Sequence, residues 1–419
     1  MRILLSAYAC TPNKGSEPGI GWNWAVTLAE QGHQVHCLTS KKHQESIIQA
    51  IHAHEQSTPN LKFHIIKVWA WLEFLKNLFP YPLIYLHYLV WQYEAYQYAL
   101  RLQQDIAFDL THHVTYGSIQ MGSRLWKLDI PFVFGPIGGG ENIPAPLKKY
   151  LSFGWFKETC RNLAAYLLLH VFKNARLCLK HASAVLVTNS DTYALAASLG
   201  ATNIRYFLDM GIKDVTPPLE RKSLADGQLK LLWVGKLVTT KGLDMVLESL
   251  YIADNPNISL TIVGNGPLRY YYQIKAYRLG LSRQVHFKGF LSYPNLKKLY
   301  ASHDALVFSP LRSAFGGQLL EAMSFGLPII TLDLHGAGFF VPEGAGIKLK
   351  LTSSKEIKQA MGGAINSMSS NPGLCEMMSI NAYEFAKAHE WRWKADEMAG
   401  IYDEVLSHQL TSSAINAKI

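Results

Sequence analysis

Residues 305–328 read ALVFSPLRSAFGGQLLEAMSFGLP, and this stretch decides the fold of the second half of the chain. Its apolar start, residues 305–308, predicts a buried strand. A polar turn follows, and Gly316-Gly317 then begins a helix that carries Glu321 one turn in. A strand, a glycine-containing turn and a helix N-terminus direct backbone N–H groups and the positive end of a helix dipole to one place. Such an arrangement suits a phosphate or a sugar hydroxyl.

A second element, earlier in the sequence, complements this one. The stretch LLWVGKLVTTKGLD contains a predicted strand at residues 231–234, followed by Gly235, Lys236, Lys241 and Gly242. Binding sites in open α/β sheets lie at the loops that follow the strands. Two lysines in such a loop supply the positive charge that a diphosphate needs.

Apolar runs alternate with helical patterns along the whole chain. The predicted strands are residues 3–7, 35–39, 63–68, 110–114, 132–134 and 184–188 in the first half, and 231–234, 260–263, 285–287, 305–308 and 329–332 in the second. Most of these runs are continuous, which is typical of parallel strands covered on both faces. The fold class is therefore α/β, with two doubly wound, Rossmann-like sheets.

The chain of 419 residues exceeds the size at which one hydrophobic core stops growing, which predicts two domains. We place the first domain at 1–212 and a linker at 213–228, which is polar and contains Pro217-Pro218. The second domain is expected at 229–388, a C-terminal helix at 389–409 and a frayed tail at 410–419.

Composition limits the partners. The net charge of +9 favours anionic partners, but the basic residues are dispersed, which argues against nucleic acid. Five cysteines without C-x-x-C spacing indicate buried thiols in a reducing compartment. No apolar run reaches the ~20 residues of a membrane-spanning helix. We therefore expect a cytoplasmic protein, with the inner face of the plasma membrane as a further expected location.

Two segments are crowded with aromatic residues. Residues 69–98 contain eleven Trp, Tyr and Phe side chains around Pro80 and Pro82, and residues 150–180 combine aromatic with basic residues. A basic, aromatic surface can lie in a membrane interface. Helices packed on a sheet have a similar composition, so both interpretations stay open.

The motifs together resemble the family 4 glycosyltransferases. The resemblance rests on Gly235-Lys236, Lys241-Gly242, Gly264-Asn265-Gly266-Pro267, Phe287-Lys288-Gly289, Ala314-Phe315-Gly316, Glu321-Ala322-Met323 and Gly326-Leu327-Pro328, and in the first half on Gly15-Ser16-Glu17, Leu28-Ala29, Gly32-His33 and Val35. It covers nearly the whole chain. It implies a GT-B fold, with two Rossmann-like domains facing across a cleft and a C-terminal helix that returns to the first domain. It also implies a retaining transferase that uses a nucleotide-activated sugar.

The resemblance gives the residues of the second half their roles. Lys236 and Lys241 would neutralise the leaving diphosphate without a metal ion, and Glu321 would accept hydrogen bonds from the ribose. The predicted donor site also includes Gly15, Gly235, Gly264, Ser313, Phe315, Gly316, Gly317 and Leu319. Three positions depart from the family pattern, and one of them is Met210, where many members have asparagine. Ser313 stands where the family has a first glutamate, and Lys236 replaces an arginine, which removes a bidentate fork.

The first domain supplies the remaining candidates. Residues 15–21, GSEPGIG, are predicted to form a loop after the first strand. His112, at the end of the fourth strand, either contacts the donor sugar or acceptor or is structural. Glu141 follows the glycine-rich turn 135–140 and is a candidate for binding substrate hydroxyls. The predicted acceptor site is Glu17, Tyr116, Gly138, Gly139 and Glu141, and the predicted catalytic residues are Lys236, Lys241, His112 and Glu141.

The sequence thus predicts a metal-independent, retaining glycosyltransferase without a bound cofactor. It would use a UDP-, GDP- or ADP-sugar and a hydroxyl of a glycan or lipid-linked acceptor. No carboxylate stands out as a nucleophile, and the resemblance to the family favours front-face attack over double displacement. Two alternatives remain: a nucleotide-sugar epimerase with a GT-B fold, and a nucleotide-sugar-binding protein that has lost catalysis, the latter suggested by Ser313.

Overall fold

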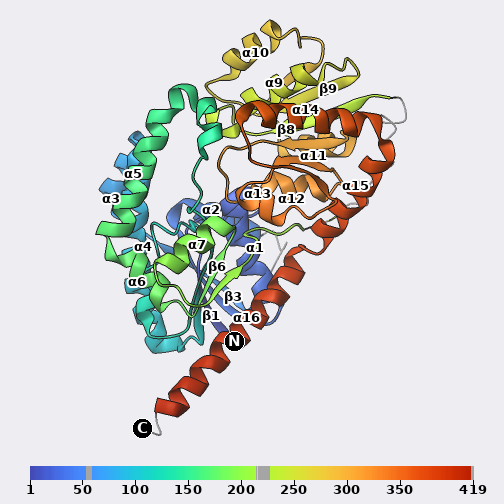
Figure 1. Cartoon of the computed structure of the whole chain (residues 1–419). Helices are drawn as coiled ribbons and strands as arrows, with labels where there is room; N and C mark the ends of the chain where they lie inside the picture. The colour runs from blue at the N-terminus through green and yellow to red at the C-terminus, as the bar shows by residue number, and fades with distance from the viewer. Residues whose placement is uncertain (53–58, 214, 216–226, 417–419) are drawn as a thin grey trace. The chain divides into compact units, whose positions relative to one another are not determined.

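The computed structural model describes residues 1–52, 59–213, 215 and 227–416, and the chain forms two compact units (Figure 1). The first unit comprises Met1–Gly140, Leu163–Gly211 and Trp391–Ile419, and the second comprises Glu141–Asn162 and Ile212–Glu390. Residues 141–162 thus group with the second unit, although the sequence placed all of 1–212 in the first domain. The linker expected at 213–228 lies largely outside the described residues.

The first unit contains a seven-stranded sheet in which every strand is parallel to its neighbours. In spatial order the strands are β3 (Leu61–Ile66), β2 (Gln34–Ser40), β1 (Arg2–Ser6), β4 (Leu110–His113), β5 (Phe132–Ile137), β6 (Ala184–Val187) and β7 (Ile204–Tyr206). The order reverses between β1 and β4, which are adjacent although two strands separate them in sequence. The predicted doubly wound sheet is confirmed.

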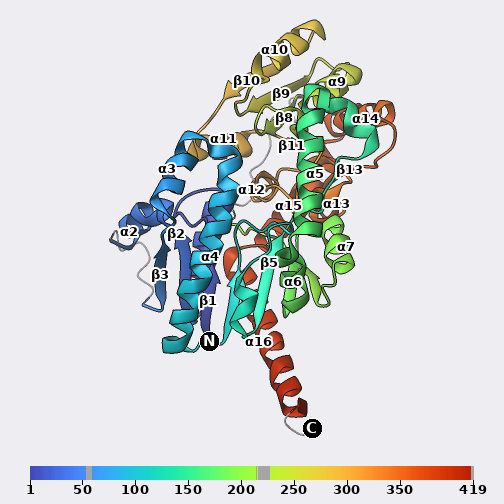
Figure 2. The ribbon, with the colours of Figure 1, turned by 90° about the vertical axis from the view of Figure 1, so that its left-hand side faces the viewer.

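Helices cover this sheet (Figure 2). They are α1 (Ser16–Glu30), α2 (Gln44–His52), α3 (Ala70–Leu78), α4 (Pro80–Ile106), the part of α5 (Trp155–Val171) from Leu163 onward, α6 (Lys173–His181), α7 (Ser190–Ser198) and α16 (Trp391–Asn416). None of the described helices in the chain is both long and apolar enough to span a bilayer.

The C-terminal helix α16 packs on the first unit, as the family resemblance implies. The indole of Trp391 packs edge-on against that of Trp24 in α1, with ring centroids 5.3 Å apart. The Tyr402 hydroxyl lies 2.6 Å from Nδ1 of His112 at the end of β4. The helix α16 continues to Asn416, beyond the end at 409 expected for the C-terminal helix, and residues 417–419 of the expected frayed tail lie outside the described residues.

The second unit contains a six-stranded parallel sheet. In spatial order its strands are β10 (Val285–Gly289), β9 (Ile258–Val263), β8 (Leu229–Val234), β11 (Ala305–Phe308), β12 (Ile329–Leu332) and β13 (Gly346–Leu349). Its α-helices are the part of α5 up to Asn162, α9 (Leu243–Ala253), α10 (Arg269–Arg278), α11 (Tyr293–Ser302), α12 (Gly317–Met323), α13 (His335–Phe340), α14 (Ser354–Ser370) and α15 (Pro372–Lys387). The unit also contains two 3-10 helices, η3 (Ala145–Gly154) and η4 (Thr239–Lys241).

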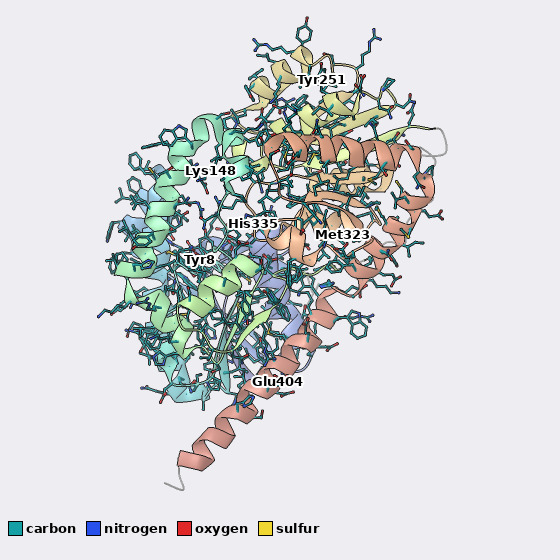
Figure 3. The ribbon with its side chains drawn as sticks, in the orientation of Figure 1. Tyr8, Lys148, Tyr251, Met323, His335 and Glu404 are labelled. Atoms are coloured by element: carbon teal, nitrogen blue, oxygen red, sulfur yellow. The ribbon has the colours of Figure 1, made fainter. Side chains whose placement is uncertain are left out.

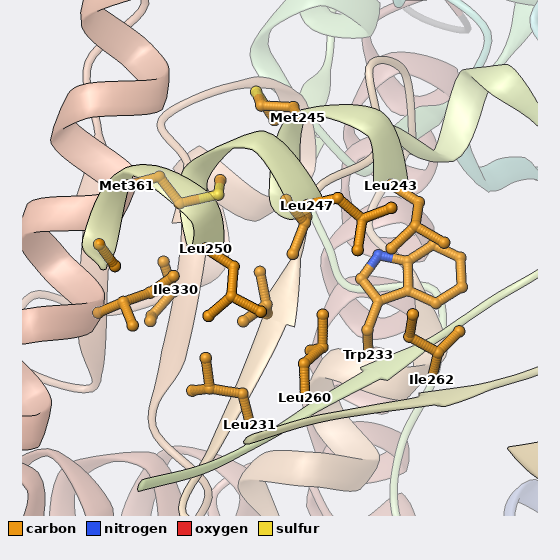
Figure 4. Packing of buried hydrophobic residues seen from close by; sticks show 14 of the residues in the cluster. Leu231, Trp233, Leu243, Met245, Leu247, Leu250, Leu260, Ile262, Ile330 and Met361 are labelled. Atoms are coloured by element: carbon orange, nitrogen blue, oxygen red, sulfur yellow. The ribbon is translucent and has the colours of Figure 1, made fainter. Parts of the chain in front are cut away.

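One hydrophobic core explains why residues 141–162 join the second unit. Leu231, Trp233, Leu260 and Ile262 of the sheet point toward Leu243, Leu247 and Leu250 of α9 (Figure 4). The same cluster includes Ile143, Leu147, Tyr150 and Leu151, which are all buried. Because burying one large apolar side chain contributes about 1.5–3 kcal/mol, these four fix the segment to this unit.

Three local predictions differ from the structure. Residues 15–21 were expected to form a loop, but α1 begins at Ser16. Gly19 and Gly21 lie in that helix against backbone carbonyl oxygens of Lys14 and Ala9, where a Cβ would not fit. The glycines therefore allow close packing of the helix. The edge strands β7 and β13 were not predicted, because they are short and only partly buried.

Candidate functional site

The second sheet reverses its strand order between β8 and β11. From β8 the chain builds outward to β9 and β10 on one side, and β11, β12 and β13 lie on the other. Ligands of open α/β sheets bind at the carboxyl ends of the strands at such a switch point. Both motifs singled out in the sequence follow these two strands, so the fold brings them together. His335, the first residue of α13, follows the carboxyl end of β12 in the same sheet and is labelled in Figure 3.

Hydrogen bonds join the loop after β8 to the loop after β11. The Ser309 hydroxyl donates to the carbonyl oxygen of Lys241 at 2.9 Å, and the Leu311 amide donates to that of Thr240 at 2.9 Å. Gly242 has φ of 68° and lies against the Ser309 carbonyl, so a side chain at this position would be both strained and obstructed. The position of Lys241 is therefore set by the neighbouring loop.

The two predicted lysines differ in their surroundings. Lys236 is exposed. Lys241 is partly buried, and burial lowers the pKa of its ammonium group, with the positive charge of Arg312 adding to the effect. A bound anion would offset both effects. Lys241 is thus a group whose charge is stabilised by a ligand such as a phosphate.

Glu321 lies on α12 in a poorly solvated position. Its carboxylate accepts a hydrogen bond from the Tyr300 hydroxyl at 3.1 Å. Burial raises the pKa of Glu321, while the Tyr300 hydrogen bond and the charge of Lys297 act in the opposite direction. The carboxylate keeps further acceptor capacity for a sugar hydroxyl.

The other residues predicted for the donor site have mixed surroundings. The side chains of Phe315 and Leu319 are fully buried, so only their backbone groups can reach a ligand. The Ser313 hydroxyl donates to the Phe315 carbonyl at 3.1 Å. Gly316, with φ of 115°, precedes Gly317 at the start of α12, and a Cβ on it would meet the ring of Phe308. Position 316 therefore requires glycine.

Gly235 and Gly264 serve a packing role. They follow β8 and β9, and a Cβ on Gly264 would overlap the carbonyl of Gly235. The two glycines let the ends of these strands approach each other. Contact of either glycine with a donor stays a prediction.

Sequence reasoning missed a cluster of charged residues beside Lys241. The carboxylate of Glu158, at the start of α5, accepts hydrogen bonds from Nε of Arg312 at 3.0 Å and from Nε of Arg161 at 3.0 Å. Arg312 lies inside the stretch quoted first, directly before Ser313, so its position was a usable signal. Glu158 is 154 residues away in sequence, and no pattern connects it with Arg312.

His112 is placed in the core of the first unit. Its Nδ1 pairs with the Tyr402 hydroxyl at 2.6 Å and its Nε2 with the carbonyl of Gly135 at 2.7 Å. Burial lowers the pKa of His112 to about 3, so the imidazole is neutral at physiological pH. This environment fits the structural interpretation of the histidine. Its contact with a substrate stays a prediction.

The predicted acceptor residues of the first unit cluster around its own switch point. The backbone amide of Tyr116, after β4, donates to the carboxylate of Glu17 at 3.0 Å. Gly15 directly precedes α1, which carries Glu17. Gly138 and Gly139 are held to the same loop, since the Gly138 amide donates to Gly117 and the Gly139 carbonyl accepts from Gln120.

Glu141 is the exception among the predicted acceptor residues. It is buried and groups with the second unit, where its backbone carbonyl accepts from Arg161 at 3.4 Å. Within the described residues, no three His, Cys, Asp or Glu side chains converge in a way that could hold a metal ion.

Comparison with known proteins agrees with this geometry. Residues 217–385 match the family described as glycosyl transferases group 1. An uncharacterized glycosyltransferase of Methanocaldococcus jannaschii is 35% identical over 112 residues, which cover 26% of this chain and 29% of that protein. A putative glycosyltransferase of Bacillus subtilis, EpsD, is 26% identical over 186 residues, which cover 44% of this chain and 47% of that protein. Each match spans less than half of the relative's own length.

Solved structures match over almost the full chain. Sucrose-phosphate synthase from Thermosynechococcus elongatus superposes with a TM-score of 0.65 at 17% identity, over 97% of this chain and 99% of the other. Anabaena HepE, solved in complex with UDP, superposes with a TM-score of 0.61 at 15% identity, over 96% of this chain and 100% of the other. The chain has the GT-B fold. The matched range 217–385 contains every GT-B donor-site candidate of the second unit, from Gly235 to Glu321.

Proposed function

We propose that the protein is a retaining glycosyltransferase that moves a sugar from a nucleotide-diphosphate donor to a hydroxyl of a glycan or lipid-linked acceptor. The main support is Lys241, a partly buried cation at the switch point of the second sheet, within the range that matches glycosyl transferases group 1. UDP is the first candidate nucleotide, because HepE was solved with UDP and with UDP-glucose.

In this proposal the second unit binds the donor. Lys241 and the more exposed Lys236 face the diphosphate, the N-terminal end of α12 adds its dipole, and Glu321 accepts hydrogen bonds from the ribose. These groups stabilise the negative charge that develops on the leaving group, so a metal ion is not required. Glu17, Tyr116, Gly138, Gly139 and Glu141 stay the proposed acceptor residues, with Gly15 on the donor side and His112 as a contact to either substrate.

Retention of configuration follows from front-face attack. The bond between the anomeric carbon and the diphosphate oxygen breaks, and the acceptor oxygen forms its new bond on the same face of the sugar. The acceptor proton passes to the departing phosphate oxygen. No external base is then required, which agrees with the lack of an assigned carboxylate nucleophile.

The first test measures nucleotide release from UDP-, GDP- and ADP-sugars by the wild type, Lys241→Ala and Glu321→Ala, with and without a metal chelator. Lys348→Ala, which changes a lysine of β13 outside the site, is the matched control. We expect one donor to be turned over with the chelator present, the Lys241 variant to be at least about 100-fold slower, and the control to be unchanged. Equal rates in all variants would remove Lys241 from the site.

Product analysis distinguishes the alternatives. An epimerase changes the stereochemistry of the donor sugar without an acceptor. A binding protein that has lost catalysis binds the nucleotide but releases none from any donor, whichever acceptor is supplied. Ser313 motivates the second case, because a carboxylate is expected at that position by the resemblance.

A second proposal concerns a membrane surface. Aromatic and aliphatic side chains of the first unit are exposed on and beside α3: Trp69, Trp71, Phe74, Leu78 and Phe79 are each 49–64% accessible. The part of α5 in the first unit exposes Leu163, Tyr166, Leu167 and Val171. With Lys173, Arg176 and Lys180 on the adjoining α6, they suit an anionic lipid surface.

Vesicle sedimentation tests this surface. We expect the protein to sediment with phosphatidylserine vesicles at low salt and to be released at high salt. Trp71→Ser combined with Phe74→Ser should reduce the bound fraction several-fold. Tyr270→Ser combined with Tyr277→Ser, on the exposed face of α10, is the control and should have no effect. Equal binding of both double variants would contradict the proposal.

A further inference from the structure

A buried carboxylate holds an arginine beside the loop that carries Lys241. The side chain of Glu158 is 9% exposed. Arg312 approaches it with two nitrogens, Nε at 3.0 Å from Oε1 and Nη2 at 3.4 Å from Oε2. A guanidinium group held by two donors has a fixed plane and direction. Glu158 therefore sets the orientation of Arg312.

Arg312 keeps donors that the protein does not use. A guanidinium group has five N–H donors, and Glu158 accepts from two nitrogens of Arg312. Over residues 1–52, 59–213, 215 and 227–416, the side-chain hydrogen bonds of Arg312 go to Glu158 alone and use Nε and Nη2, which leaves the two N–H groups on Nη1. Its side chain is only 27% exposed. The remaining donors are available to a ligand that accepts hydrogen bonds.

The cluster also carries a surplus of positive charge. Its cations are Lys241, Arg312 and Arg161, and its carboxylates are Glu158 and Glu141. Arg161 is occupied within the protein, because it donates to Glu158 and to the backbone carbonyl of Glu141. The charge of Arg312 acts on Lys241 and contributes to the lowered pKa of that lysine. Repulsion between these two cations is relieved by an anion that lies near both.

We propose that Arg312 is a third cation of the donor site and binds the diphosphate together with Lys241, with Glu158 as its positioning residue. This inference rests on the proposed function and adds two residues to it. The planar fork of an arginine fits two phosphate oxygens, a geometry that the ammonium group of Lys236 does not provide.

The proposal also gives Ser313 a physical meaning. A glutamate at position 313 would place a second carboxylate next to Arg312 and compete with the diphosphate for it. The Ser313 hydroxyl instead donates to the carbonyl of Phe315 and leaves the arginine to an anion. Glu158 comes from residues 141–162, so a segment between β5 and β6 of the first sheet completes the donor site of the second unit.

The test compares UDP with uridine, which lacks the phosphates. UDP affinity is measured by calorimetry and uridine affinity by ligand-observed NMR, on the full chain. We expect Arg312→Ala to weaken UDP about 10-fold or more and uridine less than about 2-fold, and Arg312→Lys to recover part of the loss. Lys348→Ala, a matched loss of a paired cation in the same unit, should leave both affinities unchanged.

Glu158→Gln tests the positioning role. We expect it to weaken UDP about 3- to 5-fold, and to have no further effect in combination with Arg312→Ala, because Glu158 acts through Arg312. A merely structural role would weaken UDP and uridine equally and would add to the Arg312 effect. If Arg312→Ala does not fold, the comparison of Arg312→Lys with Lys348→Ala replaces it. We then expect Arg312→Lys to weaken UDP binding about 3-fold and to leave uridine binding unchanged.

Each outcome separates this inference from the function on which it rests. UDP binding that is unchanged in the Arg312 variants, or equal losses for UDP and uridine, would overturn the role of Arg312 and leave the transferase proposal standing. A wild type that binds none of UDP, GDP and ADP would overturn both proposals.

Discussion

Lys394 allows a test of the C-terminal helix as part of the first unit. This lysine of α16 is 2% exposed, and its Nζ lies 3.9 Å from the ring centroid of Phe207. Burial lowers the pKa of Lys394 from 10.5 to about 7, and the charges of Glu397 and Asp209 counteract only part of this. Folding therefore releases the proton of this lysine at pH values between the two pKa values.

The sign and size of the effect follow from this difference. The folded pKa lies below the unfolded one, so stability rises with pH between about 7 and 10.5 and is lost as the pH falls. One pKa unit corresponds to about 1.4 kcal/mol, so the penalty from Lys394 is about 4 kcal/mol at pH 7 and about 1.5 kcal/mol at pH 9.5. Lys394→Met removes a pH-dependent difference of about 3 kcal/mol.

The assay is urea unfolding at pH 7 and pH 9.5, read by hydrogen exchange in peptides of α1, β4 and α16. These elements pack on one another, so they report on the unit that contains Lys394. From pH 7 to pH 9.5 the free energy of unfolding of the wild type should rise by about 3 kcal/mol more than that of Lys394→Met. Lys173→Met, at an exposed lysine of α6, is the control and should match the wild type. The same gain in the wild type and in Lys394→Met would mean that Lys394 stays charged in the folded protein, which refutes the reasoning.

Three further predictions concern the second unit. Tyr300→Phe removes the hydrogen bond to Glu321 and should lower the free energy of unfolding by about 1–3 kcal/mol, measured as a lower unfolding temperature. The same variant should bind the nucleotide more weakly. Gly242→Ala should cost about 1–2 kcal/mol or more, because φ is 68° and the Ser309 carbonyl blocks the Cβ; native-like thermal unfolding would contradict this. Cys160 is the one exposed thiol of the five, so a thiol reagent should modify one cysteine in the native protein and five after denaturation.

Sequence patterns were sufficient for most strands and for the two loop motifs that follow β8 and β11. The run at residues 305–308 is the strand β11, and its neighbour β8 contains the predicted 231–234. Both are fully or largely buried, so their apolar character is continuous. The edge strand β13 lacks this signal, because three of its four residues are only partly buried.

Contacts between distant segments could not be predicted from one sequence. The glycines of 15–21 indicated a loop, but they lie in or next to a helix whose packing requires small residues. His112 could be read as a contact to substrate or as structural, and only the position of Tyr402 on α16 accounts for its buried partners. Pairing of Glu158 with Arg312 depends on tertiary packing and leaves no local pattern.

The second unit is discontinuous in the chain, and this has a consequence for synthesis. Residues 141–162 leave the ribosome well before residues 212–390, which supply most of the core that covers Leu147 and Tyr150. These apolar side chains therefore stay uncovered while the rest of the unit is translated, and a chaperone has a defined segment to protect during that interval. A truncated gene that begins at residue 212 would produce a second unit without part of its interior.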